Sequence, residues 1–285
     1  MTITRVLPFR PPCLQLPARL AGLSMALLKA TALEVAILAG HLLLYPSGIA
    51  QERRIIAELP PPDAAPRLPA ESRPPVVLLH GFIDNRSVFV LLRRSLAQHG
   101  GQHVESLNYS PLTCDIRTAA ELLGRHIEEI CERTGHHRVD IVGHSLGGLI
   151  ARYYAQRLGG DERVRTLVTL GTPHGGTRVV PLADAHPIVR QMRPGSDLIE
   201  ELREPAPGCR TRFVSFWSDL DQLMAPLETA CVNHPDLDAQ NVRVSGIGHL
   251  ALSVHPAVAA GIRQALDPPA PGTAATGAEN GLTVA

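Results

Sequence analysis

The segment from Gly143 to Gly147, with the sequence Gly-His-Ser-Leu-Gly, constrains the fold of this chain more than any other. It follows the mostly apolar run 139–142, and a helical pattern begins shortly after it at Leu149. This order indicates a strand, a sharp turn and a helix, with Ser145 at the apex of the turn. Such a turn strains the serine backbone and exposes the hydroxyl, while small neighbours let the strand and the helix approach closely. We therefore predict that Ser145 is a nucleophile.

A nucleophilic serine needs a base and an acid that orients the base, and in this architecture both follow the serine, the acid first. His249 is the predicted base, because a strand-like apolar run ends in glycines and then presents this histidine in a loop. The predicted acid is Asp221, with Asp219 as the alternative. Both aspartates follow a strand that we expect to end near residue 217 or 218.

Backbone N–H groups that bind an oxyanion are expected at two places. One is Leu146, which follows the serine at a helix N-terminus. The other is Phe82, in the loop after the short apolar strand 76–79. These donors stabilise the negative charge that develops on a carbonyl oxygen, and the loss of one costs roughly 3–4 kcal/mol of transition-state stabilisation.

Together these residues resemble bacterial α/β-hydrolase lipases of the triacylglycerol-lipase and carboxylesterase branch. The resemblance covers about residues 74–268, and the stretches that carry it are His80-Gly81-Phe82, Gly143 to Gly148, Gly171 to Thr177, the Asp221 loop and Gly248-His249. It implies a carboxylic ester hydrolase that acts on lipids through an acyl-enzyme and requires no cofactor. Further substrate-binding residues are expected at His80, His144, His174 and Val179. No cysteine or histidine spacing resembles a zinc site, so we predict no metal.

The remainder of the central region alternates between strand and helix patterns. A helical face begins at Ile116, and Gly135 is well placed to end that helix. Short strands that alternate with such helices predict an α/β-hydrolase fold, with a mostly parallel central sheet, helices on both faces and a small cap insertion. The predicted strands are 76–79, 104–107, 139–142, 164–170, 212–216 and 242–244.

Shifts in composition predict the domain organisation. An apolar helical extension spans 1–58, a proline-rich linker spans 59–75, and the catalytic domain spans 76–266. Within that domain, residues 178–210 form a cap-like insertion with two short amphipathic helices. Residues 267–285 are expected to be a disordered tail, because they contain little apolar content.

The N-terminal extension is open to more than one interpretation. Residues 20–45 are strongly apolar, but Lys29, Glu34 and His41 interrupt them. A helix with Glu34 and His41 on one face suits a membrane surface or the protein's own surface better than a membrane span. A signal peptide is the other interpretation, although Lys29 is unfavourable for one. We expect an exported or membrane-associated protein, with a cytoplasmic location still open.

The charge of the chain bears on the class of partner that it binds. The formal net charge is zero, so no basic field favours nucleic acid. Lipid or another ester is the expected substrate, with a membrane surface as the possible partner of the N-terminal segment.

Cys209 and Cys231 bracket the Asp221 loop and are the best disulfide candidates if the chain is exported. Cys131 fits the core face of its helix, where a buried thiol is expected.

Two other functions remain compatible with the sequence. An acyltransferase uses the same three residues, with an alcohol in place of water at the second step. A non-catalytic binding protein with this fold would lack part of the triad, whereas here every role has a candidate.

Overall fold

The computed structural model describes residues 25–43, 73–82, 86–98, 103–109, 115–179, 186–267 and 282–283. Several expected features lie outside these residues. They are the signal-peptide region before residue 25, segment 44–58 of the extension, linker residues 59–72, insertion residues 180–185 and tail residues 268–281.

The core of the fold is a parallel sheet, in the order β2-β1-β3-β4-β5-β6-β7. Its strands in the described residues are β1 Val76–Leu79, β2 Val104–Leu107, β3 Val139–His144, β4 Val164–Leu170, β5 Arg212–Ser218, β6 Asp238–Ser245 and β7 Leu282–Thr283. The predicted parallel sheet is confirmed. Strand β6 begins earlier than predicted, because its polar first residues pair with β5 through backbone groups from Arg212 and Asp238 onward.

One short part of the tail that was predicted to be disordered is a strand. Leu282 and Thr283 form β7 and pair with Val244 and Ser245 of β6. Without this strand β6 would be the edge of the sheet, where unpaired backbone N–H and C=O groups favour the addition of another strand.

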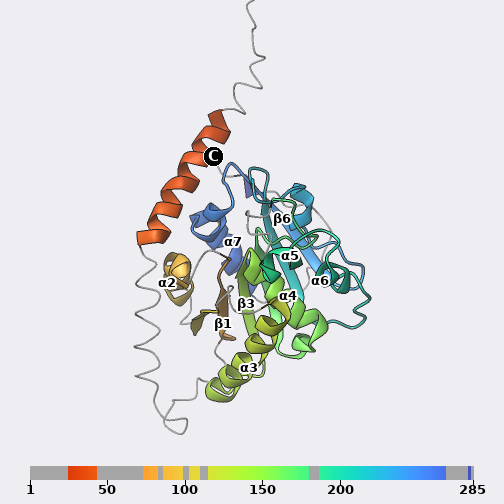
Figure 1. Cartoon of the computed structure of the whole chain (residues 1–285). Helices are drawn as coiled ribbons and strands as arrows, with labels where there is room; N and C mark the ends of the chain where they lie inside the picture. Colours follow the sequence, from red (N-terminus) through yellow and green to blue (C-terminus); the bar gives the residue numbers. More distant parts are fainter. Residues whose placement is uncertain are drawn as a thin grey trace, which may run out of the picture.

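Helices surround the sheet (Figure 1). They are the N-terminal helix Met25–Leu43, η2 Arg86–Phe89, α2 Val90–Gln98, α3 Ile116–Thr134, α4 Leu146–Arg157, η3 Gly160–Glu162, α5 Pro187–Gln191, α6 Asp197–Glu201, η4 Leu227–Ala230, η5 Leu250–Ser253 and α7 Pro256–Leu266.

Two apolar layers cover the two faces of the sheet. Val77 and Leu79 of β1 pack with α3, α4 and the insertion helices α5 and α6. Val76 and Leu78 point the other way and pack with α2, η5 and α7. Because successive strand residues face opposite sides, a continuous apolar run such as β1 is what a strand buried on both faces requires. The predicted helices on both faces are confirmed.

Helix α3 shows how local sequence sets an element's limits. The Asp115 side chain accepts a hydrogen bond from the Thr118 N–H at 2.8 Å, which satisfies a free donor of the first turn. Gly135 ends the helix in a left-handed conformation with φ of 76°, and its N–H donates to the Cys131 carbonyl. Cys131 lies in the core as expected, and burial raises the pKa of its thiol.

The insertion contains α5 and α6, which are the two short helices that the sequence predicted. Their buried residues join the layer formed by α3 and α4. Polar contacts add to this packing: Tyr153 of α4 donates to Glu201 at 2.7 Å, and Arg152 donates to the Leu202 carbonyl at 2.9 Å. The insertion is therefore attached to the helix that follows Ser145.

The N-terminal helix lies along the domain on the side of α2 and α7 (Figure 1). Ala30 and His41 are buried, and Ile37 packs against the same core layer as α7. The helix is long and apolar enough to cross a membrane by length and composition, with a mean hydropathy of 1.6. Apolar residues that are more than half exposed occupy its opposite face: Met25, Leu28, Val35, Leu42 and Leu43.

Candidate active site

Ser145 occupies the turn between β3 and α4, as the sequence predicted. Its φ of 51° and ψ of −118° make it the one non-glycine residue with positive φ among the described residues. The turn requires small neighbours. A Cβ on Gly147 would lie 2.4 Å from the Leu79 carbonyl oxygen, and one on Gly148 would lie 2.0 Å from the Thr172 hydroxyl. Backbone strain of this kind persists where the surrounding packing over-determines the conformation.

The two predicted oxyanion donors lie on adjoining segments. Leu146 is the first residue of α4, so its N–H has no acceptor one turn earlier in the helix. The contact between Gly147 and the Leu79 carbonyl brings the end of β1 against this first turn, and Phe82 follows shortly after β1. The Phe82 ring makes an edge contact with His186 of the insertion, at 6.0 Å between centroids. The oxyanion role of both residues stays a prediction.

Asp221 and His249 form a buried pair. Nδ1 of His249 donates to Oδ2 of Asp221 at 2.7 Å, and the two side chains are 5% and 1% exposed. The other carboxylate oxygen of Asp221 accepts the Leu223 N–H at 2.9 Å, which holds the carboxylate in place. A buried carboxylate that binds Nδ1 leaves Nε2 of the imidazole as the atom that can accept a proton.

Asp219, the alternative acid, has different partners. Its carboxylate forms an ion pair with Arg243 at 2.9 Å and accepts the Gly246 N–H at 3.3 Å. The Arg243 side chain is 53% exposed, so this pair lies at the surface. Of the two aspartates, it is therefore Asp221 that the structure pairs with His249.

Contacts between loops bring the serine turn to the Asp221–His249 pair. The His144 ring lies 4.8 Å from the His249 ring, centroid to centroid, and its Nε2 donates to the His249 carbonyl at 3.2 Å. The Thr172 hydroxyl, just after β4, donates to the Ser145 carbonyl at 3.0 Å. Ser145, Asp221 and His249 thus follow β3, β5 and β6 at the carboxyl edge of one parallel sheet, where sites of open α/β sheets lie.

Gly171 leaves room for the acid and the base, a requirement that the sequence did not reveal. A Cβ at this position would lie 3.0 Å from both Oδ2 of Asp221 and Nδ1 of His249, and the φ of 53° disfavours other residues.

We expect Gly171→Ala to lower kcat about 100-fold, because small displacements of reacting groups have effects of that size. Steady-state kinetics of the folded variant would measure this. A kcat within twofold of wild type would contradict the assigned importance of this contact.

The other predicted substrate-binding residues are in different environments. His80 stacks on Tyr109 with ring centroids 4.4 Å apart, and its Nδ1 donates to the Gly81 carbonyl. His174 is buried with Nε2 3.0 Å from the Thr169 hydroxyl, and burial holds its pKa well below the ordinary value. Val179 is 41% exposed. These contacts and those of His144 support loops at the site, and contact with substrate stays a prediction.

The disulfide that we considered between Cys209 and Cys231 is not formed. The Ser215 hydroxyl donates to the Ala230 carbonyl, which places Cys231 beside the middle of β5. Cys209 precedes the first residue of β5. The strand from Arg212 to Ser215 alone spans about 10 Å, at about 3.3 Å per residue. A disulfide requires Cα atoms about 4.4–6.8 Å apart, so the pairing predicted from position along the chain was wrong.

Glu34 is the other site residue that the sequence did not reveal. Its carboxylate accepts the N–H groups of Leu250 and Ala251 at 2.8 and 2.9 Å, directly after His249. On the same helix, the Thr31 hydroxyl accepts a hydrogen bond from Gln222, the neighbour of Asp221, at 3.3 Å. The sequence placed Glu34 and His41 on one face of the helix, but no local pattern indicates the partner of Glu34.

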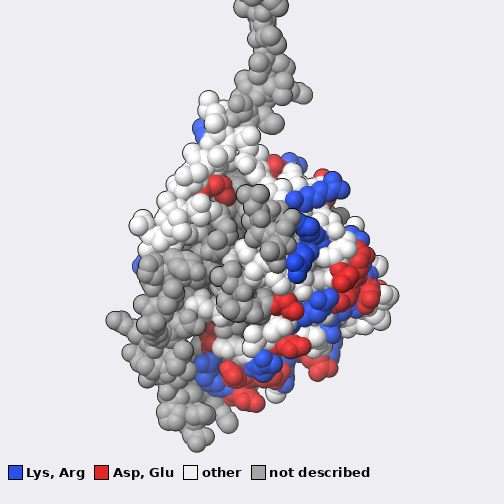
Figure 2. All heavy atoms as spheres, in the orientation of Figure 1, with Lys and Arg blue, Asp and Glu red and all other residues white. Residues whose placement is uncertain are grey.

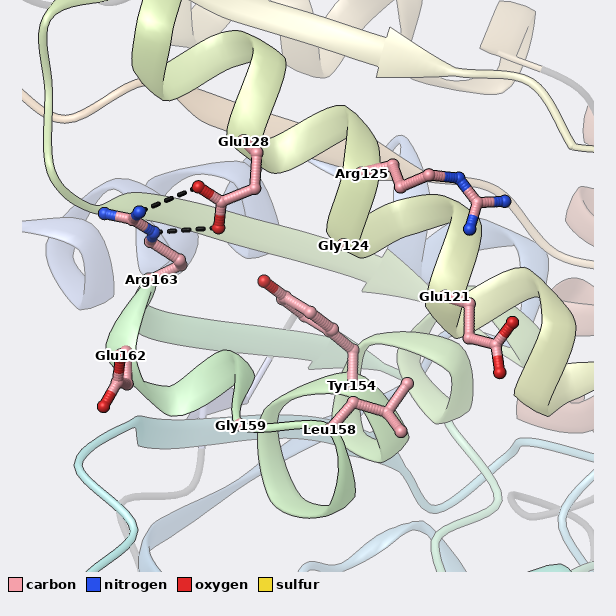
Figure 3. Close-up of a pocket in the computed structure, with 9 residues that line it drawn as sticks. All are labelled: Glu121, Gly124, Arg125, Glu128, Tyr154, Leu158, Gly159, Glu162 and Arg163. Atoms are coloured by element: carbon pink, nitrogen blue, oxygen red, sulfur yellow. Dashed lines mark hydrogen bonds and ion pairs between the residues drawn. The ribbon is translucent and has the colours of Figure 1, made fainter.

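A depression of about 450 Å³ lies away from this site, between α3 and η3 (Figure 3). The Tyr154 ring points from α4 towards α3, where Gly124 leaves room for it. Burial raises the pKa of Tyr154 to about 12, and Arg163 pairs with Glu128 beside it. Because η3 precedes β4, this depression lies at the opposite edge of the sheet from Ser145.

Comparisons with known proteins agree with the observed fold. Residues 74–204 match a protein family described as the alpha/beta hydrolase fold. The chain has the α/β-hydrolase fold. The chain is 30% identical over 115 residues, or 38% of its length, to triacylglycerol lipases of Pseudarthrobacter phenanthrenivorans and Burkholderia plantarii. The matched part spans 35% and 32% of those relatives.

Solved structures support the same fold. Lipase B of Aspergillus fumigatus is similar with a TM-score of 0.62 and 18% identity, over 74% of this chain and 58% of that one. A mature lipase of Bacillus licheniformis has a TM-score of 0.59 and 16% identity, over 70% of this chain and 95% of that one. The resemblance to lipases that the sequence indicated is confirmed.

Proposed function

We propose that this α/β hydrolase cleaves carboxylic esters of lipids through a Ser145–Asp221–His249 triad. The observation that carries the proposal is the buried Asp221–His249 pair, whose base is joined through His144 to the strained Ser145 turn. Similarity to triacylglycerol lipases supports an ester as the substrate. Hydrolysis of a series of nitrophenyl esters from short to long chains tests it, and no hydrolysis of any member would contradict it.

In this mechanism each residue has one role. Ser145 Oγ attacks the ester carbonyl carbon while Nε2 of His249 takes the hydroxyl proton, and Asp221 stabilises the imidazolium. The N–H groups of Leu146 and Phe82 bind the oxyanion. When the tetrahedral intermediate collapses, the carbon–oxygen bond to the alcohol breaks, and His249 returns the proton to the leaving alcohol. Water, deprotonated by His249, then attacks the acyl-enzyme and releases the carboxylic acid and Ser145.

The N-terminal helix favours a lipid over a dissolved ester as the substrate. Its outer face carries a row of apolar side chains that are 55–82% exposed, while its inner face contacts the domain. Figure 2 shows a surface almost without charge on this helix, whereas charged side chains gather over the opposite part of the catalytic domain. A helix with these two faces suits the plane of a membrane surface. The helix would then hold the triad beside the layer that contains its substrate.

We expect a Val35→Gln, Leu42→Gln double variant to bind neutral phosphatidylcholine vesicles at least tenfold more weakly. Burial of one such side chain is worth about 1.5–3 kcal/mol, and each 1.4 kcal/mol is a factor of ten in affinity. Hydrolysis of emulsified long-chain esters should fall with it, and hydrolysis of dissolved short-chain esters should stay within twofold. Vesicle co-sedimentation and the two rate assays measure these effects.

The matched control is Leu122→Gln, at an exposed leucine of α3 on the other side of the sheet. It should change neither vesicle binding nor either rate. Deletion of the whole helix is a poorer experiment, because it also removes the Glu34 contact to the η5 turn. Equal losses on emulsified and dissolved esters in the double variant would count against a role of this face at the membrane.

A further inference from the structure

Glu34 contacts the catalytic domain at the turn that presents the base. The two hydrogen bonds from the N–H groups of Leu250 and Ala251 satisfy the first free donors of η5, which begins directly after His249. A carboxylate that accepts backbone N–H groups at the start of a helical turn makes strong, charge-assisted hydrogen bonds. Glu34 is separated in the chain by 216 residues from Leu250 and by 217 residues from Ala251.

Gly248 provides a second, independent observation at the same place. A Cβ on Gly248 would lie 2.6 Å from both Cγ and Cδ of Glu34. Gly248 does not have a positive φ, whereas Gly246 has a φ of 89°. The backbone conformation therefore permits a side chain at position 248, and a Cβ there would displace the end of the Glu34 side chain.

His249 is thus held on three sides. Asp221 binds Nδ1 of its ring at 2.7 Å, and His144 binds its carbonyl oxygen at 3.2 Å. The carboxylate of Glu34 holds the two N–H groups that follow it. The first contact sets the direction of the ring, while the other two fix the backbone from which the ring extends.

We propose that Glu34 is a positioning residue for His249, and that the N-terminal helix is in this way part of the catalytic apparatus. The inference rests on the triad of the proposed function and adds to it a residue outside the catalytic domain. Glu34 does not touch the substrate. It holds the η5 turn so that Nε2 of His249 is directed at Ser145 when the proton moves.

The test compares Glu34→Ala and Glu34→Gln in the full chain, with Lys29→Gln as the control. Lys29 is the other charged residue of the helix and is exposed. With a dissolved short-chain ester, Glu34→Ala should lower kcat about 10- to 100-fold, the size expected for a misplaced catalytic group, and leave KM within twofold. Glu34→Gln keeps one acceptor oxygen, so its loss should be smaller. Lys29→Gln should match wild type.

The rate at which a nitrophenyl phosphonate labels Ser145 is the second measurement, because it reports activation of the serine without turnover. It should fall in parallel with kcat in the Glu34 variants. Circular dichroism at the assay temperature gives the folded fraction of each variant, and each rate is divided by the concentration of folded protein. Equal rates for Glu34→Ala and Lys29→Gln would overturn the inference. A wild-type protein whose Ser145 is neither labelled nor active would instead overturn the proposed function itself.

A double-mutant cycle with Gly248→Ala separates positioning from general destabilisation. Gly248→Ala should lower kcat by displacing the Glu34 carboxylate. In the Glu34→Ala background the same change should have little further effect, because the side chain that it displaces is gone. Residues that act through one contact show such non-additivity. Losses that multiply would mean that Gly248 acts independently of Glu34, and the inference would fail.

Discussion

Replacement of Ser145 by alanine is expected to reduce kcat by at least about 10⁵-fold while the protein stays folded. Loss of the nucleophile removes the acyl-enzyme route, and the binding site and oxyanion donors alone retain only a small part of catalysis. The fold should persist, because the hydroxyl of Ser145 makes no contact that holds the turn in the described residues, whereas the Ser145 carbonyl still accepts from Thr172. Stopped assays with nitrophenyl esters measure the rate.

The same experiment identifies the nucleophile chemically. A nitrophenyl phosphonate should label wild-type protein at Ser145 and leave Ser145→Ala unlabelled, as read by peptide mass spectrometry. Ser245→Ala, at a serine that ends the neighbouring strand β6, is the control and should retain both labelling and activity. Labelling of any other serine, or a Ser145→Ala variant with wild-type turnover, would show that the assignment of the nucleophile is wrong.

Asp221→Asn is expected to lower kcat about 10⁴-fold, by analogy with the effect of the same substitution in a serine-protease triad. With its oxygen on the Leu223 N–H, the asparagine turns its NH2 group towards Nδ1 and donates to it, so His249 is held in the wrong tautomer, and the neutral amide does not stabilise the imidazolium as the carboxylate does. The geometry should change little, because asparagine has nearly the same shape and its oxygen can still accept the Leu223 N–H. KM should change much less than kcat.

Asp219→Asn is the matched control, since it makes the same chemical change two positions earlier. Asp219 pairs with the exposed Arg243, and surface ion pairs contribute about 1 kcal/mol or less to stability. We expect less than a tenfold loss of kcat. If Asp219→Asn had the larger effect, Asp219 would be the acid, and the Asp221–His249 hydrogen bond would not be the one that catalysis uses.

Much of the fold follows from patterns within short stretches of sequence. The strand patterns predicted β1, β2 and β4 at their observed limits, and the periodicity from Ile116 predicted α3 up to Gly135. The serine turn was recognisable because apolar residues, glycines and the serine occur in one consecutive segment. In each case the residues that determine the structure are neighbours in the chain.

Other predictions failed because the deciding contact is distant in sequence. Spacing suggested a Cys209–Cys231 disulfide, but the hydrogen bond of Ser215 to the Ala230 carbonyl places Cys231 beside the middle of a strand that Cys209 precedes. Low apolar content gave no indication that Leu282 and Thr283 pair with β6. The separation of Cys209 from Cys231 and the pairing of β7 with β6 both depend on residues that are distant in the chain.

The sequence by itself determined the α/β-hydrolase architecture and indicated the serine and histidine of the candidate site, because strand runs, helical periodicity and turn glycines act locally. Only the tertiary structure decided which aspartate faces His249, since both lie in one loop and the choice depends on where β6 places the histidine. It alone revealed Gly171 and Glu34. Both are recognised by what lies against them, and that depends on how distant helices and loops pack around the sheet.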